Sequence, residues 1–176
     1  MEQPDREKAL IKFRNGSSQI LVTTDLASRG LDIPEIEYII HYQLPHTKEA
    51  FLHRNGRTAR MHADGTAYLL LNPDQHPDFL DKMPEIEKLP EKLVLPKPTK
   101  WATLYIAAGK KDKVNKVDIV GLLLQKGKLN KDELGLIEVL DYSSYVAVDK
   151  KKIVKAVDLI RNEKIKNKKV KIEIAR

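Results

Sequence analysis

The stretch QILVTTDLASRGLDIPEIEYIIHY, residues 19–42, decides the fold of the amino-terminal half. It contains two apolar runs, 19–24 and 36–42, which a polar loop separates. Short apolar runs bounded by polar loops are typical of strands buried in a parallel sheet. A helix over about 48–62 and a third apolar run, 65–71, follow. Strand and helix therefore alternate, which predicts an α/β layer.

A helix is predicted before this stretch, in QPDREKALIKFRNG, residues 3–16. Pro4 suits a first helical turn, acidic residues near the start suit the positive end of the helix dipole, and Gly16 suits the end. Three strands are few for a parallel α/β layer, and the sequence opens on a helix. We therefore expect residues 1–72 to be part of a larger domain whose opening strands precede this sequence.

The carboxyl-terminal part follows a proline-rich segment. Six of the nine prolines fall within residues 73–98, so we expect a linker over 73–100, partly laid against a domain surface. Beyond it the predicted elements are a strand 102–107, a helix 117–125, strands 135–141 and 144–149, a helix 150–162 and a strand 169–175. This β-α-β-β-α-β order predicts a small α+β domain over 101–176.

One face of the carboxyl-terminal sheet should be covered by the predicted helix 150–162. Its apolar residues Ile153, Val154, Val157 and Ile160 fall on one side, and lysines fall on the other. The opposite face of the sheet would then be open to a ligand.

Charge is concentrated in this second half. Residues 1–100 hold 14 Lys and Arg against 15 Asp and Glu, whereas residues 101–176 hold 18 against 10. A cationic module beside a near-neutral one indicates a nucleic-acid or other anionic partner, with a solvated lysine-rich surface as the alternative. The apolar runs are too short for membrane spans, and the sequence has no cysteine, so we expect a cytoplasmic protein without membrane contact.

The stretch HRNGRTAR, residues 53–60, places Arg54, Arg57 and Arg60 at three-residue intervals. On a helix these arginines would lie on one side and repel one another, and Gly56 would weaken the helix by roughly 1 kcal/mol relative to Ala. An anion would offset both costs. Arginine suits phosphate because its planar guanidinium donates two parallel hydrogen bonds and stays charged.

The loop TTDLASRGLD, residues 23–32, follows a predicted strand, at the edge where open α/β sheets bind ligands. Thr24 and Asp25 can hydrogen-bond a phosphate or a ribose, Gly30 permits close approach of the backbone, and Asp32 can accept from a sugar hydroxyl. Each residue alone is compatible with ordinary turn chemistry. Together with the arginines they favour a nucleotide or nucleic-acid site.

These segments resemble motifs of the DEAD-box RNA helicases. TTDLASRGLDIP, residues 23–34, resembles motif V, IIHYQ, residues 39–43, resembles the strand that follows it, and HRNGRTAR is similar to motif VI, commonly HRIGRTGR. QPDR, residues 3–6, resembles the shorter QxxR motif. The resemblance covers residues 1–72 and implies a partial second RecA-like domain.

The resemblance also implies roles for individual residues. Arg57 and Arg60 would be the catalytic arginine fingers, and ATP would contact Gly30, Asp32, Arg57 and Arg60. The RNA backbone would contact Gln3, Arg6, Thr24 and Gly30. His53 and Arg54 would couple the two sites. Asn55 and Ala59 depart from the usual wording of motif VI but leave its charged positions intact.

The sequence contains neither a GxxxxGK[ST] phosphate loop nor an Asp-Glu-Ala-Asp stretch. ATP with Mg would be bound mainly by an absent first RecA-like domain, so we expect this chain to be inactive by itself. No histidine lies in an HExxH pattern, and we expect no metal site in the chain.

The tail resembles the carboxyl-terminal RNA-binding domain of DbpA-type bacterial DEAD-box helicases, in LYIAAGKKDKVNKVDIVGLL, residues 104–123, and LGLIEVLDYSSYVAVD, residues 134–149. The resemblance implies an RRM-like fold, a hairpin of large-subunit ribosomal RNA as target, and a role on pre-ribosomal particles in ribosome assembly. Alternatives are a non-catalytic RNA-tethering module and a protein-interaction module.

Two groups of tail residues are candidates for RNA contact. Tyr105 and Tyr145 fall on the two strands whose aromatic side chains stack bases in RRM domains. The basic-Gly-aromatic opening of the RRM signature is missing before Tyr145, so that residue is equally compatible with a core position. The second group is a run of lysines expected to contact the RNA backbone, Lys110, Lys111, Lys113 and Lys116.

Overall fold

The computed structural model describes residues 2–25, 36–56, 58 and 65–175. It divides into two compact units, Met1–Leu21 with Lys97–Arg176, and Val22–Pro96. In the described ranges, no helix has the length and apolar character needed to cross a membrane.

The unit Val22–Pro96 contains a small parallel α/β layer. Strand β1 (Tyr38–His41) is followed by helix α3 (Lys48–Asn55) and strand β2 (Thr66–Leu69). The two strands pair in parallel, in a register that runs from Tyr38 opposite Thr66 to His41 opposite Leu69. A helix that connects two parallel neighbours is the βαβ unit, so the α/β architecture predicted for this half is confirmed.

The strand predicted over 19–24 is not formed, and that prediction was wrong. Residues 20–24 have no strand structure, and Ile20 and Val22 are 75% and 92% exposed. A strand is stabilised by hydrogen bonds to a neighbouring strand and by burial of its faces. Among the described residues β1 pairs with β2 alone, so the apolar run at 19–24 has neither contribution.

The proline-rich segment carries no helix or strand between residues 73 and 98. Phe79 packs on Phe51 of α3 with ring centroids 5.1 Å apart, so the start of the segment lies against its unit, as expected. Further along, Ile86 and Val94 are 93% and 90% exposed. These two side chains therefore do not lie against a domain surface.

The carboxyl-terminal unit forms the predicted β-α-β-β-α-β fold. Its main elements are β3 (Trp101–Ile106), α4 (Lys116–Gln125), β4 (Leu134–Val139), β5 (Ser144–Asp149), α5 (Ile153–Ile160) and β8 (Ile172–Ile174). The four strands form one antiparallel sheet in the order β4-β5-β3-β8. Short elements between them are the 3-10 turns η1 (Lys110–Asp112) and η2 (Lys131–Glu133), and strands β6 (Lys164–Ile165) and β7 (Lys168–Lys169).

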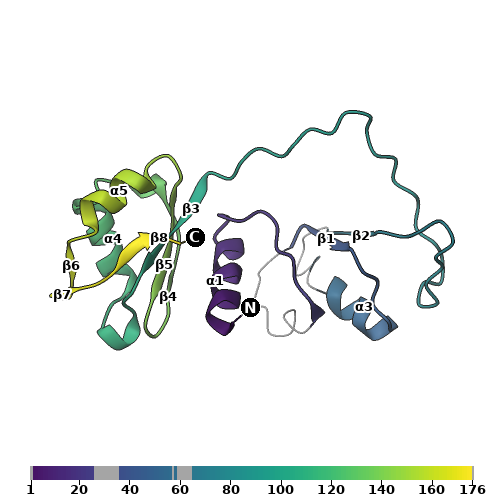
Figure 1. Cartoon of the computed structure of the whole chain (residues 1–176), viewed down its shortest axis with the longest axis horizontal. Helices are drawn as coiled ribbons and strands as arrows, with labels where there is room; N and C mark the ends of the chain where they lie inside the picture. The colour runs from purple at the N-terminus through teal and green to yellow at the C-terminus, as the bar shows by residue number, and fades with distance from the viewer. Residues whose placement is uncertain (1, 26–35, 57, 59–64, 176) are drawn as a thin grey trace. The chain divides into compact units, whose positions relative to one another are not determined.

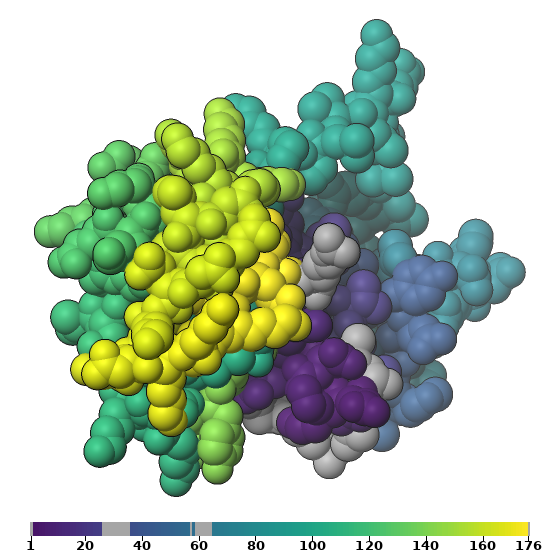
Figure 2. All heavy atoms as spheres, turned by 60° about the vertical axis from the view of Figure 1, so that its left-hand side comes forward, coloured from purple at the N-terminus to yellow at the C-terminus, as the bar shows by residue number. Residues whose placement is uncertain are grey.

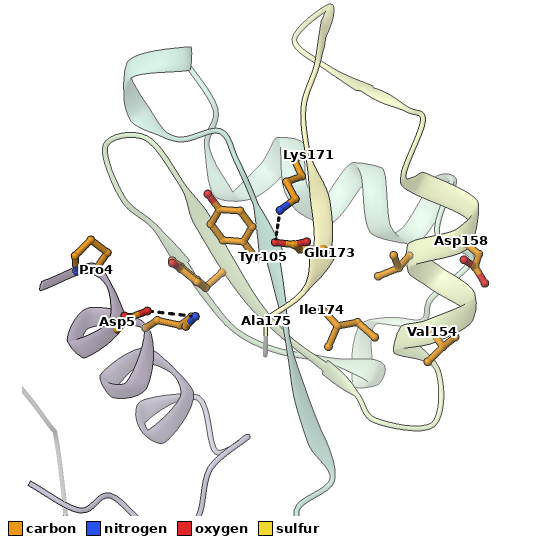
Figure 3. A pocket seen from close by; sticks show the side chains of 12 residues that line it. Pro4, Asp5, Tyr105, Val154, Asp158, Lys171, Glu173, Ile174 and Ala175 are labelled. Atoms are coloured by element: carbon orange, nitrogen blue, oxygen red, sulfur yellow. Dashed lines mark ion pairs between the residues drawn. The ribbon is translucent and has the colours of Figure 1, made fainter. Parts of the chain in front are cut away.

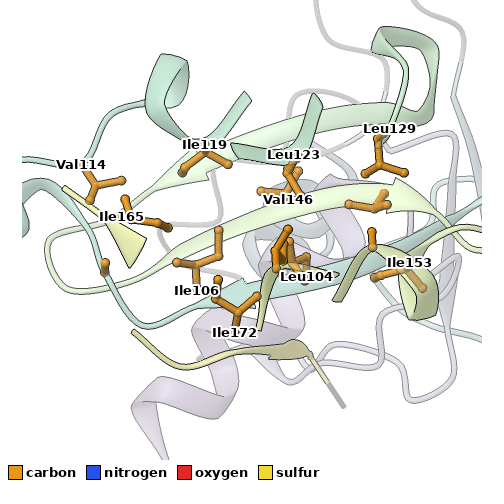
Figure 4. Close-up of a cluster of buried hydrophobic side chains, with 14 residues drawn as sticks. Leu104, Ile106, Val114, Ile119, Leu123, Leu129, Val146, Ile153, Ile165 and Ile172 are labelled. Carbon is orange, nitrogen blue, oxygen red and sulfur yellow. The ribbon is translucent and has the colours of Figure 1, made fainter. Parts of the chain in front are cut away.

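The core of this unit lies between the sheet and helices α4 and α5 (Figure 4). Alternate strand residues such as Leu104 and Val146 point to it, and Ile119 and Leu123 of α4 complete it without exposed surface. The face predicted for the second helix was partly wrong. Val154 is 60% exposed, and Ala156 is buried with Ile153 and Ile160 instead, because the 3–4 spacing of these three residues faces the sheet.

Helix α1 (Gln3–Arg14) lies against the other face of the same sheet (Figure 1). Asn15 at its end donates from Nδ2 to the hydroxyl of Thr103 over 2.9 Å, and Ser17 lies 2.6 Å from the same hydroxyl. Thr103 is 1% exposed as a result. The expectation of an open sheet face was therefore wrong, because the helix that was predicted in the amino-terminal half covers it.

Candidate nucleic-acid interface

Motifs V and VI meet at an ion pair between Arg54 and Asp25. Arg54 lies on the last turn of α3, a helix whose first turn is capped by the Thr47 side chain accepting from the Ala50 N–H. Its guanidinium donates to both carboxylate oxygens of Asp25, from Nε over 2.5 Å and from NH2 over 2.7 Å. This two-point geometry fixes orientation as well as distance. The structure therefore links the loop after residue 24 directly to motif VI.

Residues at and just after the end of β1 also contact Arg54. Its NH1 group donates to the main-chain oxygen of Gln43 over 2.8 Å. His41, 2% exposed, lies 2.8 Å through Nε2 from the side-chain oxygen of Asn55. Burial lowers the pKa of His41, the charge of Arg54 lowers it further, and the hydrogen bond from Asn55 opposes both. Nδ1 of His41 also lies 3.4 Å from NH1 of Arg54.

The remaining helicase-type residues fall into three groups. Thr24 and His53 are exposed in the same unit, on the loop and on α3. Gln3 and Arg6 lie exposed on the first turns of α1, in the other compact unit. Outside the described residues lie Gly30, Asp32, Arg57 and Arg60. Thr58, between the two last arginines, is buried and donates its hydroxyl to the main-chain oxygen of Ile36.

The four candidate lysines of the tail surround the turn η1. Lys110 and Lys111 form it, Lys113 follows in a left-handed conformation with φ 61°, and Lys116 begins α4; all four are exposed. In the described part of the chain no ion pair joins any of the four to a carboxylate. Four exposed lysines on one short segment can bind phosphates.

Backbone contacts hold this lysine turn in place. The N–H groups of Lys110 and Lys111 donate to the carbonyls of Leu140 and Asp141 over 2.8 and 2.9 Å, which anchors the turn on the connection between β4 and β5. Gly109 permits this approach, because a side chain there would collide with the Leu140 carbonyl. The turn is therefore a fixed platform for its lysines.

A second set of lysines, which the sequence did not assign to the site, lies on the hairpin of β6 and β7. Its two-residue turn is Lys166-Asn167, both with positive φ. Lys166 pairs with Asp118 of α4 over 2.8 Å, and Lys168 pairs with Asp112 of η1 over 2.9 Å. These hydrogen bonds, with donation from backbone N–H groups, lower the pKa of both aspartates. These two ion pairs therefore hold the β6–β7 hairpin next to η1 and the start of α4.

Tyr105 and Tyr145 face each other on neighbouring strands, with ring centroids 5.3 Å apart. Tyr145 is 7% exposed, and burial raises the pKa of its phenol. A hollow of about 870 Å³ lies beside them. It is also lined by Asp5 of α1 and by Lys171 and Glu173, which form an ion pair of 2.8 Å (Figure 3). Both tyrosines line this hollow, but Tyr105 is partly exposed whereas Tyr145 is buried.

The positively charged side chains of the candidate site are arginines and lysines. In the ranges described here, no group of three or more His, Cys, Asp or Glu side chains is close enough to hold a metal ion. The cations are arginine and lysine side chains, which bind nucleotides and nucleic-acid backbones directly.

Comparison with known proteins matches two families along the chain. Residues 1–62 match the helicase conserved C-terminal domain, and residues 103–174 match the DbpA RNA binding domain. The ATP-dependent RNA helicase DbpA of Escherichia coli (strain K12) is 34% identical over 181 residues, covering 99% of this chain and 40% of the relative. The Bacillus subtilis (strain 168) DbpA is 30% identical over 207 residues, covering 99% and 43%.

A rice relative matches a shorter part of the chain at higher identity. DEAD-box ATP-dependent RNA helicase 53 of Oryza sativa subsp. japonica is 52% identical over 75 residues, which are 43% of this chain and 12% of that protein. The chain spans about two fifths of the length of the two DbpA relatives.

Proposed function

We propose that this chain is the carboxyl-terminal region of a DbpA-type DEAD-box RNA helicase, that the intact protein unwinds RNA with ATP, and that residues 101–176 hold it on its RNA. The observation that carries the proposal is the ion pair between Arg54 and Asp25. This ion pair joins motif V, to which the resemblance assigns RNA contacts, with motif VI, to which it assigns ATP contacts.

The nucleotide chemistry in this proposal depends on the arginines of motif VI. ATP with Mg is bound mainly by a phosphate-loop lobe that this sequence does not contain. Arg57 and Arg60 stabilise the charge that develops on the transferred phosphoryl group, and such arginine fingers contribute a rate factor of roughly 10³–10⁵. Gly30 and Asp32 hold the nucleotide from the motif V side. The chain alone then hydrolyses no ATP.

Coupling between RNA and nucleotide follows from the same ion pair. Thr24, which contacts the RNA backbone in this proposal, is the residue before Asp25. Asp25 holds Arg54, and Arg54 lies three residues before Arg57. A shift of the loop on RNA binding therefore reaches the arginine fingers through two parallel hydrogen bonds. His53, the neighbour of Arg54, belongs to this coupling segment, and Gln3 and Arg6 add RNA contacts from α1.

The tail selects the RNA. The four lysines around η1 bind phosphates, and Tyr105 contacts a base from the hollow beside the sheet. The target that the DbpA resemblance suggests is a hairpin of large-subunit ribosomal RNA, within pre-ribosomal particles in the cytoplasm, so that local unwinding serves ribosome assembly.

A test of the helicase half requires the missing lobe. The chain is joined to a phosphate-loop lobe of a DbpA relative, and RNA-stimulated ATP hydrolysis is measured. Arg57→Ala and Arg60→Ala should each lower turnover by at least 10³-fold, whereas Arg161→Ala, on the tail, should not. Near-normal turnover of the motif VI variants would refute the assignment.

A second candidate is a protein-interaction module, which the buried position of Tyr145 favours, because it removes one base-stacking side chain from the sheet. Titration of the 176-residue chain with a ribosomal RNA hairpin distinguishes an RNA-binding tail from a protein-interaction module. RNA binding through lysines must weaken as salt rises. Absence of RNA binding at low salt would favour the protein-interaction module.

A further inference from the structure

The connection between β4 and β5 presents an exposed aromatic side chain, Tyr142. Residues 101–176 contain four aromatic residues, Trp101, Tyr105, Tyr142 and Tyr145. The structure describes all four; Tyr142 is 72% exposed, and the other three are partly or fully buried. Single exposed aromatic side chains are common on protein surfaces, so exposure alone decides nothing. What matters is the position of Tyr142, which is next to the lysines around η1.

Backbone hydrogen bonds fix Tyr142 beside η1. The N–H of Leu140 donates to the carbonyl of Ser143 over 2.8 Å, so Asp141 and Tyr142 form a two-residue loop between the strands. The carbonyls of Leu140 and Asp141 accept hydrogen bonds from the first two residues of η1 over 2.8 and 2.9 Å. The peptide group directly before Tyr142 is therefore tied to the lysine turn.

A further contact anchors the chain after Tyr142. Ser144, at the start of β5, is 0% exposed and donates its hydroxyl to the carbonyl of Ala108 over 2.7 Å. The loop is thus held to the segment around η1 on both sides of the tyrosine. A side chain on a fixed backbone loses little freedom when a ligand binds it, and tyrosine has only two side-chain torsions to order. Tyr142 is therefore prepared for a flat ligand.

The β6–β7 hairpin is joined to the same region, because Lys168 pairs with Asp112 of η1 over 2.9 Å. Figure 2 shows η1 in teal, the β4–β5 loop in green and the hairpin in yellow, close together at the lower end of the carboxyl-terminal unit. The surface that they form combines exposed lysines with one exposed aromatic ring.

Such a combination fits single-stranded RNA better than duplex RNA. Unpaired bases in loops stack on aromatic side chains, whereas paired bases are already stacked on one another. We propose that an unpaired base of the bound RNA stacks on Tyr142 while the lysines around η1 hold the neighbouring phosphates. The proposal rests on the function proposed above, because it names a base-recognising residue within that RNA site.

The first test measures binding of the 176-residue chain to an RNA hairpin with an unpaired loop and to a blunt-ended duplex of the same composition. Tyr142→Ala should weaken binding of the hairpin about 5- to 150-fold, the range for loss of one stacked base. Tyr142→Phe keeps an aromatic face and should stay within about twofold of the unaltered chain. Neither variant should change binding of the duplex.

Two controls separate stacking from other effects. Leu159→Ala, at a 44% exposed apolar position of α5, should change binding to neither RNA. Because Tyr142 contributes no positive charge, Tyr142→Ala should leave the slope of log K against log salt unchanged, whereas changes of the lysines around η1 should flatten it. Circular dichroism of Tyr142→Ala should match that of the unaltered chain, since the side chain is largely exposed.

The possible outcomes distinguish this assignment from the proposed function. Unweakened hairpin binding by Tyr142→Ala, or an equal loss on hairpin and duplex, would overturn the assignment of Tyr142 and leave lysine-dependent RNA binding in place. Absence of hairpin binding by the unaltered chain at low salt would refute the proposed function itself.

The second test uses the unaltered chain, so it does not depend on how a variant folds. The hairpin carries 5-iodouridine in its loop, which crosslinks on irradiation to an aromatic side chain stacked on it. Mass spectrometry should map the main crosslink to Tyr142. Crosslinks confined to Tyr105, or to residues outside the β4–β5 connection, would overturn the proposal.

Discussion

Replacement of the lysines around η1 by glutamine should flatten the salt dependence of RNA binding. The four lysines Lys110, Lys111, Lys113 and Lys116 are exposed and, within the described ranges, have no carboxylate in an ion pair. Each phosphate contact contributes about −0.7 (single strand) to −0.9 (duplex) to the slope of log K against log salt. Four contacts therefore predict a slope of about −2.8 to −3.6.

This slope has a measurable consequence. Raising salt from about 50 to about 200 mM should weaken binding by about 50- to 150-fold for four contacts. Each single Lys→Gln change should remove about 0.7–0.9 from the slope. Fluorescence anisotropy with a labelled ribosomal RNA hairpin, titrated at five salt concentrations, gives the slope for each variant.

Two controls separate local contacts from general charge. Lys155→Gln removes one exposed positive charge from α5, away from η1, and should leave the slope unchanged. Lys166→Gln removes a lysine that is already paired with Asp118, and it should change the salt slope less than any of the four substitutions around η1. A uniform decrease for every lysine, Lys155 included, would refute a specific lysine platform and favour the alternative of a solvated cationic surface.

Three further predictions concern motif VI and the stability of each unit. Arg54→Lys keeps the charge but loses the two-point contact with Asp25. It should lower RNA-stimulated ATP turnover of the joined enzyme about tenfold, a barrier change of about 1.4 kcal/mol. Unchanged turnover would exclude coupling through this pair. Leu123→Ala, at a 0% exposed position, should lower the free energy of unfolding by about 2–5 kcal/mol in urea melts, and partly buried Leu124→Ala by less. Because burial lowers the pKa of His41, the unfolded state takes up its proton first as pH falls, so stability is present above about pH 6.5 and is lost on acidification. Between pH 7 and 5, the melting temperature should change less in His41→Gln than in the unaltered chain. An equal change in both chains would contradict this.

The sequence predicted most of the carboxyl-terminal domain, because its elements bury their own faces. Alternation in 144–149 and the helical spacing around Ile119 and Leu123 describe one local core, and β5 and α4 lie within one residue of the predicted bounds. The strand predicted over 19–24 was wrong for the opposite reason. Its apolar pattern requires a neighbouring strand, which sequence pattern alone cannot supply.

Two features of the candidate site depend on contacts distant in sequence. The β6–β7 hairpin is set by a left-handed Lys166-Asn167 turn and by ion pairs to Asp112 and Asp118, and asparagine was the one local signal for it. The contact of α1 with the carboxyl-terminal sheet depends on Asn15 and Thr103, which lie 88 residues apart and carry no shared pattern. The link between Arg54 and Asp25 was anticipated only as a proximity of motifs.

The kinetics of the joined enzyme test the central claim most directly, since they report on the catalytic half and the RNA-holding tail in one measurement. RNA-stimulated ATP hydrolysis is followed as a function of ribosomal RNA hairpin concentration, for the unaltered enzyme and for the variant with all four lysines around η1 changed to glutamine. We predict that the RNA concentration for half-maximal stimulation rises at least tenfold while the maximal rate is unchanged. An unchanged half-maximal concentration, or a loss confined to the maximal rate, would contradict it.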